Sequence, residues 1–149
     1  MSAKLRFEST DDPDRDTVRF LDDRLYEFNA SRTGVDDGRL LAVFVRELGR
    51  VVAGLYGWTW GGCCHVKLLW VASRHRGRGI GTRLMAMAER EARKRGASQM
   101  LLETHSFQAP EFYRRLGFRI VGEFAGYPRG HRQLFLRKRL GARSKSASP

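Results

Sequence analysis

The segment Leu68–Arg83 restricts the fold more than any other part of the chain. It starts with a short apolar run and then changes to arginine and glycine, with glycines at positions 77, 79 and 81. Beyond them, Leu84, Ala88 and Ala92 recur at helical spacing. The pattern predicts a strand, a glycine-rich turn and a helix in succession. Such a turn points free backbone N–H groups and the positive end of the helix dipole at one place, where an anion such as a pyrophosphate can bind.

Two common phosphate-binding patterns can be compared with this segment. A Gly-Lys-Ser/Thr sequence is absent, and Gly-x-Gly-x-x-Gly fails because Thr82 or Leu84 stands at the third glycine position. The sequence that fits is Arg-x-x-Gly-x-Gly, over Arg76–Gly81. Together with the apolar strand before it, this sequence resembles the acetyl-CoA loop of the GNAT-type N-acetyltransferases. A basic glycine-rich turn without a ligand is the alternative interpretation of this segment alone.

A second segment, 106–118, resembles the same family. GNAT proteins often carry Asn-x-x-Ala-x-x-x-Tyr-x-x-x-Gly-Phe after the strand that follows the acetyl-CoA helix. Four residues stand at the matching positions: Ala109, Tyr113, Gly117 and Phe118. Ser106 replaces the usual asparagine; its hydroxyl can still hydrogen-bond an amide of the pantetheine arm, with a shorter reach, or cap the helix expected near Gln108. The two motifs and the order of elements extend the resemblance over residues 4–140.

The remaining pattern predicts one mixed α/β domain over residues 1–140. Strands are expected at 4–8, 39–47, 51–58, 63–71, 100–104, 118–121 and 134–138. Helices are expected at 14–29, from the glycine-rich turn to Gly96, and at 108–116. The order β-α-β-β-β-α-β-α-β-β implies a single GNAT-like domain, with a central, mixed, mostly antiparallel twisted sheet flanked by helices. Residues 141–149 are expected to form a disordered basic tail.

Length and composition fit such a domain. The 149 residues suffice for a hydrophobic core, and 42% of them are hydrophobic and 30% charged. No apolar run approaches the roughly 20 residues of a membrane span, and the first residues lack the apolar centre of a signal peptide, so a cytoplasmic protein without membrane contact is expected. The only cysteines, Cys63 and Cys64, are adjacent, which disfavours a disulfide and a thiolate zinc site. No metal is expected.

The net charge of +12 is unevenly spread. Residues 1–50 hold nine Lys/Arg and eleven Asp/Glu, a net −2, and residues 51–149 hold nineteen and five, a net +14. The basic part contains the predicted phosphate loop, and a positive field there would help to capture coenzyme A. Solvated surface charge and nucleic-acid binding are the alternatives. Nucleic-acid binding is disfavoured because no helix-turn-helix or RNA-binding signature is present.

Acetyl transfer to an amine has its own chemical requirements. The attacking amine must be neutral, although a lysine-type amine has a pKa of about 10.4, so a base or a water chain must take its proton. The oxygen that becomes negative needs an N–H donor, which the resemblance assigns to the strand around Val71. The leaving thiolate benefits from an acid, and a tyrosine hydroxyl is suitable. Tyr113 is the candidate acid by resemblance and by chemistry, with aromatic packing as the alternative.

The sequence offers three candidates for the group that takes the proton of the amine. Glu103 and His105 lie at the end of the strand before the second motif, and His65 lies on the neighbouring strand. Strict alternation along that strand would place His65 on the same face as Val71. For each of these three side chains, a structural or solvent-exposed role is the alternative.

The resemblance implies acetyl-CoA as the cosubstrate and assigns its contacts. The candidates are Leu69, Trp70, Val71, Arg76, Gly77, Arg78, Gly79, Ile80, Gly81, Thr82, Ser106, Ala109 and Tyr113. It also places the acceptor between the end of the first helix and the last hairpin, which implies Tyr26, Asn29, Tyr127 and His131. The predicted function is direct acetyl transfer from acetyl-CoA to the amine of a small molecule. A protein lysine or N-terminus is the alternative acceptor. The sequence leaves open whether the protein forms a homodimer.

Overall fold

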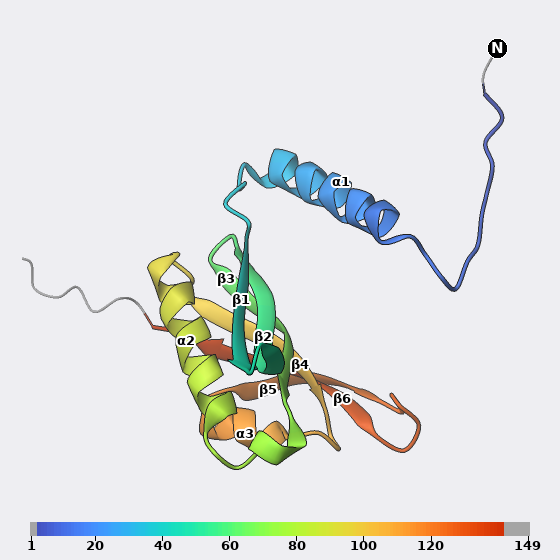
Figure 1. Cartoon of the computed structure of the whole chain (residues 1–149). Helices are drawn as coiled ribbons and strands as arrows, with labels where there is room; N and C mark the ends of the chain where they lie inside the picture. The colour runs from blue at the N-terminus through green and yellow to red at the C-terminus, as the bar shows by residue number, and fades with distance from the viewer. Residues whose placement is uncertain (1–2, 142–149) are drawn as a thin grey trace, which may run out of the picture. The chain divides into compact units, whose positions relative to one another are not determined.

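The computed structural model describes residues 3–141, so the tail prediction for 142–149 lies outside the described residues. The chain divides into two compact units, one ending at Asp36 and one beginning at Asp37. The first unit contains one helix, α1 (Arg15–Thr33), preceded by an extended segment (Figure 1). The prediction of a strand at 4–8 is wrong: this segment pairs with no strand of the described sheet. Alternation over five residues does not make a strand when no ladder partner is available.

Helix α1 has clear start and stop signals. Asp14 is the N-cap, and its carboxylate accepts hydrogen bonds from the backbone N–H and the hydroxyl of Thr17, at 2.9 and 3.0 Å. The helix ends at Gly34, which has a φ of 71° and donates its N–H to the carbonyl of Ala30. It therefore runs four residues beyond the predicted end at Asn29, because the chain has no helix-stopping residue before that glycine.

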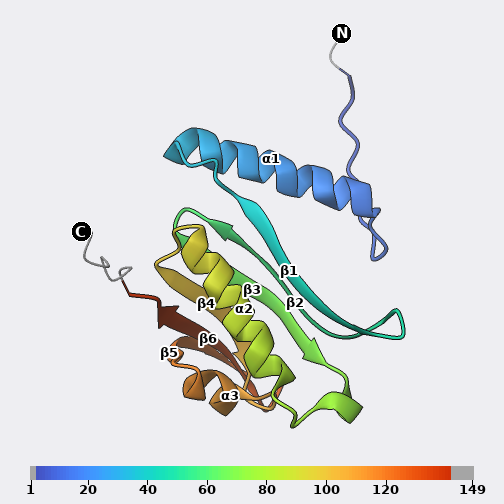
Figure 2. The ribbon, with the colours of Figure 1, turned by 60° about the vertical axis from the view of Figure 1, so that its left-hand side comes forward.

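The second unit is built on a six-stranded sheet (Figures 1 and 2). Its strands are β1 (Arg39–Glu47), β2 (Arg50–Trp60), β3 (Cys63–Val71), β4 (Gln99–His105), β5 (Arg119–Ala125) and β6 (Arg132–Arg139). The order in the sheet is β1-β2-β3-β4-β6-β5, and only β3 and β4 run parallel. The mixed α/β class and the mostly antiparallel sheet are confirmed, while the element order starts with a helix.

Two helices pack on one face of this sheet. Helix α2 (Ile80–Lys94) lies across it (Figure 2), and its buried residues Leu84 and Ala88 belong to the same core cluster as Leu55 and Met100 of the strands. The short helix α3 (Pro110–Arg115) packs on this cluster as well. The opposite sheet face carries the residues that alternate with the buried ones.

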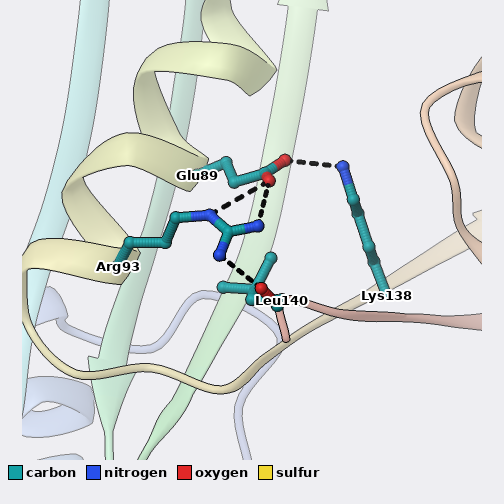
Figure 3. Close-up of polar contacts among 4 residues, drawn as sticks. All are labelled: Glu89, Arg93, Lys138 and Leu140. Atoms are coloured by element: carbon teal, nitrogen blue, oxygen red, sulfur yellow. Dashed lines mark hydrogen bonds and ion pairs between the residues drawn. The ribbon is translucent and has the colours of Figure 1, made fainter. Parts of the chain in front are cut away.

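A polar network joins α2 to the last strand (Figure 3). Glu89 accepts from Lys138 Nζ at 2.7 Å and from Arg93 Nη2 at 3.0 Å, and Arg93 also donates to the carbonyl of Leu140. Burial raises the pKa of Glu89, but the hydrogen bonds from Lys138 and Arg93 outweigh it and hold the pKa below its usual value. The network fixes α2 against the C-terminal end of strand β6.

Strand β3 contains a bulge that changes which way its side chains point. Tyr56 of β2 pairs with Leu68 and Gly57 pairs with Val66, so Lys67 is an extra residue in β3. A Cβ at Gly57 would lie 2.0 Å from the carbonyl oxygen of His65, and only glycine permits this approach. The prediction that His65 and Val71 share a sheet face is therefore wrong.

Candidate active site

The two parallel strands β3 and β4 diverge towards their carboxyl ends. They pair only from Cys63–Val66 to Gln99–Leu102. Beyond this ladder, β3 remains paired with β2 alone, and β4 remains paired with β6 alone. The facing edges of residues 67–71 and 103–105 therefore present backbone groups that pair with no other strand of the described sheet, and an extended ligand with amide groups can hydrogen-bond to them.

The backbone of β3 shows which groups face this opening. The N–H of Ala72 donates to Val52 of β2 at 2.8 Å. Successive backbone N–H groups in a strand point to opposite sides. The N–H of Val71 is therefore directed to the open edge, where the sequence predicted a donor for the negative oxygen.

The glycine-rich turn lies directly after β3. A short 3-10 turn, η1 (Ser73–His75), leads into it, and Gly77 and Gly79 have φ angles of 74° and 77°. Both are in the left-handed region that favours glycine. Gly79 is the N-cap of α2 and supplies no capping side chain, so the first N–H groups of the helix have no capping partner among residues 3–141. This geometry fits a pyrophosphate group.

Gly81 has a different role from the two turn glycines. A Cβ at this position would lie 3.3 Å from Cζ of Phe112 on α3. Gly81 therefore lets α3 approach the start of α2, and this contact brings the two sequence motifs together.

The arginines of the turn are held by partners that the sequence analysis missed. Arg76 donates from Nε to the carbonyl of Val71 at 3.1 Å. Nη1 of Arg78 lies 3.0 Å from Nδ1 of His75. Arg78 is the donor in this hydrogen bond, because a guanidinium group has no acceptor atom. His75 is buried, and Arg74 beside it bonds to Glu47 at the end of β1 at 2.6 Å. The only sequence signal for this support was a histidine immediately before the motif.

Tyr113 lies on α3, on the same side of the sheet as α2. Its ring makes edge contacts with Phe112 and Phe118, with centroids 5.0 and 6.0 Å apart. Burial raises the pKa of the Tyr113 hydroxyl above its usual value of 10. The hydroxyl therefore stays protonated at neutral pH and is available as an acid.

Ser106 does not cap α3, so that alternative is wrong: the N-cap is Ala109 and no side chain caps it. Instead, Ser106 donates its N–H to the carbonyl of Arg132 at 2.8 Å, and its Oγ accepts from the N–H of Arg132 at 3.0 Å. The hydrogen of the hydroxyl is not used in either bond and remains available for a ligand.

His65 and Glu103 lie on the sheet face opposite α2. His65 pairs with Leu101, and Glu103 follows two residues later on the same side of β4. Burial lowers the pKa of His65 below 6.5, the charge of Glu103 opposes this shift, and the charge of Lys67 adds to it. His65 also contacts the ring of Trp58, 4.7 Å between centroids. Being neutral at pH 7, His65 can accept a proton.

The four residues predicted to border the acceptor fall into two groups. Tyr127 and His131 lie in the loop between β5 and β6, where their rings contact His105 and Phe107. Tyr26 and Asn29 lie on α1, in the unit that ends at Asp36, and their role stays a prediction. None of the described helices is long and apolar enough to cross a membrane.

Comparison with known proteins identifies the family. The sequence model of the acetyltransferase (GNAT) family matches residues 5–118. The chain belongs to the GNAT family. A blasticidin-S acetyltransferase from Streptomyces morookaense is 41% identical over 117 residues, which are 73% of this chain and 84% of that protein. An acetyltransferase from Agrobacterium fabrum is 35% identical over 137 residues, which are 91% of this chain and 100% of that protein.

Solved structures agree with this assignment. The crystal structure of an acetyltransferase from Agrobacterium tumefaciens has a TM-score of 0.80 at 35% identity and covers 91% of this chain and 99% of its own. An aminoglycoside 6'-N-acetyltransferase in complex with coenzyme A has the same fold, with a TM-score of 0.62 at 22% identity, over 70% of this chain and 74% of its own. As a GNAT protein, the chain is an acetyl-CoA-dependent acetyltransferase, and acetyl-CoA is its cosubstrate.

Proposed function

We propose that the protein transfers the acetyl group of acetyl-CoA directly to the amine of a small molecule. The observation that carries this proposal is the opening between β3 and β4, which lies next to a turn suited to pyrophosphate. The name of the Streptomyces relative supports a small acceptor, because blasticidin S is a small molecule and that protein is 41% identical over 73% of this chain.

The cosubstrate contacts follow from the backbone. The free N–H groups at the start of α2 bind the pyrophosphate, and the positive turn, including Arg76 and Arg78, favours its charge. The open edge of β3, from Leu69 to Val71, hydrogen-bonds the amides of the pantetheine arm. The free hydroxyl hydrogen of Ser106 reaches the same arm from the side of β4.

The proposed proton acceptor and the proposed proton donor lie on opposite faces of the sheet. The His65–Glu103 pair takes the proton of the attacking amine, since burial keeps His65 neutral. The N–H of Val71 stabilises the oxygen that becomes negative. Tyr113 gives its proton to the leaving sulfur, because burial raises its pKa and so keeps the hydroxyl protonated until the carbon–sulfur bond breaks.

The two cysteines support direct transfer, because neither offers a reactive thiol for an acetyl-enzyme. Burial raises the pKa of Cys63, and it raises the pKa of Cys64 to about 11. The thiolate form is the nucleophile, and it is suppressed at both positions.

The test is release of coenzyme A thiol from acetyl-CoA in a panel of amines. The panel contains blasticidin S, diamines, aminoglycosides and a lysine peptide, and products are identified by mass spectrometry. We expect a mass increase of one acetyl group on a small amine. Acetylation of the lysine peptide alone would contradict the proposal and establish a protein acceptor.

A further inference from the structure

Four aromatic side chains form a connected group at the carboxyl end of β4. We call this group the aromatic pad, and it consists of His105, Phe107, Tyr127 and His131. The rings of His105 and Phe107 are stacked, with centroids 5.4 Å apart and planes at 22°. The ring of Tyr127 contacts that of His105, with centroids 5.5 Å apart, and the ring of His131 contacts that of Phe107, with centroids 4.9 Å apart.

Hydrogen bonds hold both segments of the pad in place. The two bonds between Ser106 and Arg132 join the end of β4 to the start of β6. Gln108 Oε1 accepts from the backbone N–H of His105 at 2.8 Å and from its Nδ1 at 3.2 Å. Because an amide oxygen only accepts, Nδ1 carries the hydrogen and the ring orientation is fixed. The pad is thus preorganised for a ligand.

The pad is not part of the hydrophobic core. Phe107 is 54% exposed and Tyr127 is 57% exposed, and neither belongs to the buried cluster or packs against it. Rings exposed to this degree gain little from burial. A group of exposed aromatic rings beside convergent polar groups is typical of a ligand-binding surface.

The position of the pad relates it to the proposed reaction centre. His105 follows Glu103 by two residues on the same side of β4, a separation of about 7 Å along a strand. A molecule whose ring stacks on the pad can thus extend an amine to the His65–Glu103 pair. This relation rests on the proposed function for the identity of the reacting group.

We propose that the aromatic pad binds a planar unsaturated ring of the acceptor, so that the preferred acceptors are amines with an aromatic or heteroaromatic ring. Offset stacking and edge contacts with such a ring recognise its flat face. A saturated ring of similar size buries comparable apolar area without this interaction. The proposal therefore predicts discrimination by planarity in addition to hydrophobicity.

The test is calorimetric titration of the coenzyme A-bound protein with two amines at pH 8. They are 3-phenylpropylamine and 3-cyclohexylpropylamine, which share the same charge and chain length and differ in the planarity of the ring. We expect the phenyl compound to bind roughly two- to tenfold more tightly, in line with the strength of aromatic pairs. Equal affinity, a preference for the cyclohexyl compound, or no binding of either amine would overturn the proposal.

Two variants test whether the aromatic pad is the source of the preference for the phenyl compound. Phe107→Leu should remove it, while Phe124→Leu should retain it, because Phe124 is similarly exposed and its ring contacts Phe135 outside the pad. Equal preference in wild type and Phe107→Leu would also overturn the proposal. Acetyl transfer to saturated amines without ring preference would refute the pad alone. Ring binding without transfer to any amine would refute the proposed function alone.

Discussion

The Tyr113 hydroxyl can be separated experimentally from its ring. Tyr113→Phe should keep the contacts with Phe112 and Phe118 and lose only the proton donor. We expect kcat for an identified acceptor to fall by roughly 10²-fold, within the usual range for one acid–base group, with KM for acetyl-CoA little changed. Tyr56→Phe, a change on strand β2, should alter kcat by less than about twofold because it removes no group from the proposed chemistry. Unchanged turnover in Tyr113→Phe, with chemistry rate-limiting, would reduce the residue to a packing role.

The assignment of His65 as proton acceptor predicts a pH dependence. Its pKa lies below 6.5, so kcat should be constant near pH 7 and fall as the pH drops through this lowered pKa. Glu103 favours the charged imidazolium, so Glu103→Gln should lower the pKa of His65 further and move the acid limb to lower pH. The measurement is a kcat profile between pH 5 and 8 under saturating substrates. An acid limb that persists unchanged in His65→Gln would assign the proton acceptor elsewhere.

Local geometry was predictable where a short motif specifies it. Spacing within short segments predicted the glycine-rich turn, which the positive φ angles of Gly77 and Gly79 bear out, and the short helix that carries Tyr113. His75 and Phe107 were missed, because their significance depends on side chains brought near by folding: Arg78 for the first and His131 for the second. Nothing in the adjacent sequence specifies these contacts.

The bulge in β3 depends on a single glycine in the neighbouring strand. Gly57→Ala would place a methyl group 2.0 Å from the carbonyl oxygen of His65, where the backbone must shift. We expect a loss of about 2 kcal/mol or more in the free energy of unfolding, which for a chain of this size lowers Tm by roughly 6–10 °C. Thermal unfolding followed by circular dichroism measures this change.

A second glycine provides the matched control. At Gly122 in β5, an added Cβ would meet its nearest neighbour, Phe135, at an ordinary 3.9 Å. Gly122→Ala should therefore change Tm by only a few degrees at most. Equal Tm values for the two variants would show that β3 can adopt a regular ladder and that the bulge does not require glycine at 57.

Elements were predictable where the pattern is local. The expected strands at 39–47 and 63–71 coincide with β1 and β3, because alternation and flanking turns define them. The strand at 4–8 and the side-chain alternation along β3 were wrong, since each depends on how the segment pairs with another strand, which its own sequence does not show. Gly57 within an apolar run was the available signal for the bulge.

Charge divides unequally between the two units of the molecule. Residues 1–36 hold six Lys/Arg and nine Asp/Glu, a net −3, whereas residues 37–149 hold twenty-two and seven, a net +15. The net positive charge of the protein thus comes entirely from the unit that contains the glycine-rich turn. Coenzyme A binding should weaken as salt is raised from 50 to 500 mM, because screening reduces the attraction of its phosphates.

Binding of the cosubstrate to the whole folded chain can be measured through its stability. Acetyl-CoA at 100 times its Kd should stabilise the native state by about 2.7 kcal/mol and raise Tm accordingly. Gly79→Asp should abolish this rise, because the carboxylate stands beside the free N–H groups at the start of α2 and repels the pyrophosphate. Gly49→Asp is the matched control: Gly49 has a φ of 78°, against 77° for Gly79, and lies in the turn between β1 and β2. Both variants place an aspartate at a similar positive φ and add the same charge, so the control accounts for these two effects. Only Gly79→Asp should lose the response to acetyl-CoA, and a full response in a folded Gly79→Asp protein would refute the phosphate site.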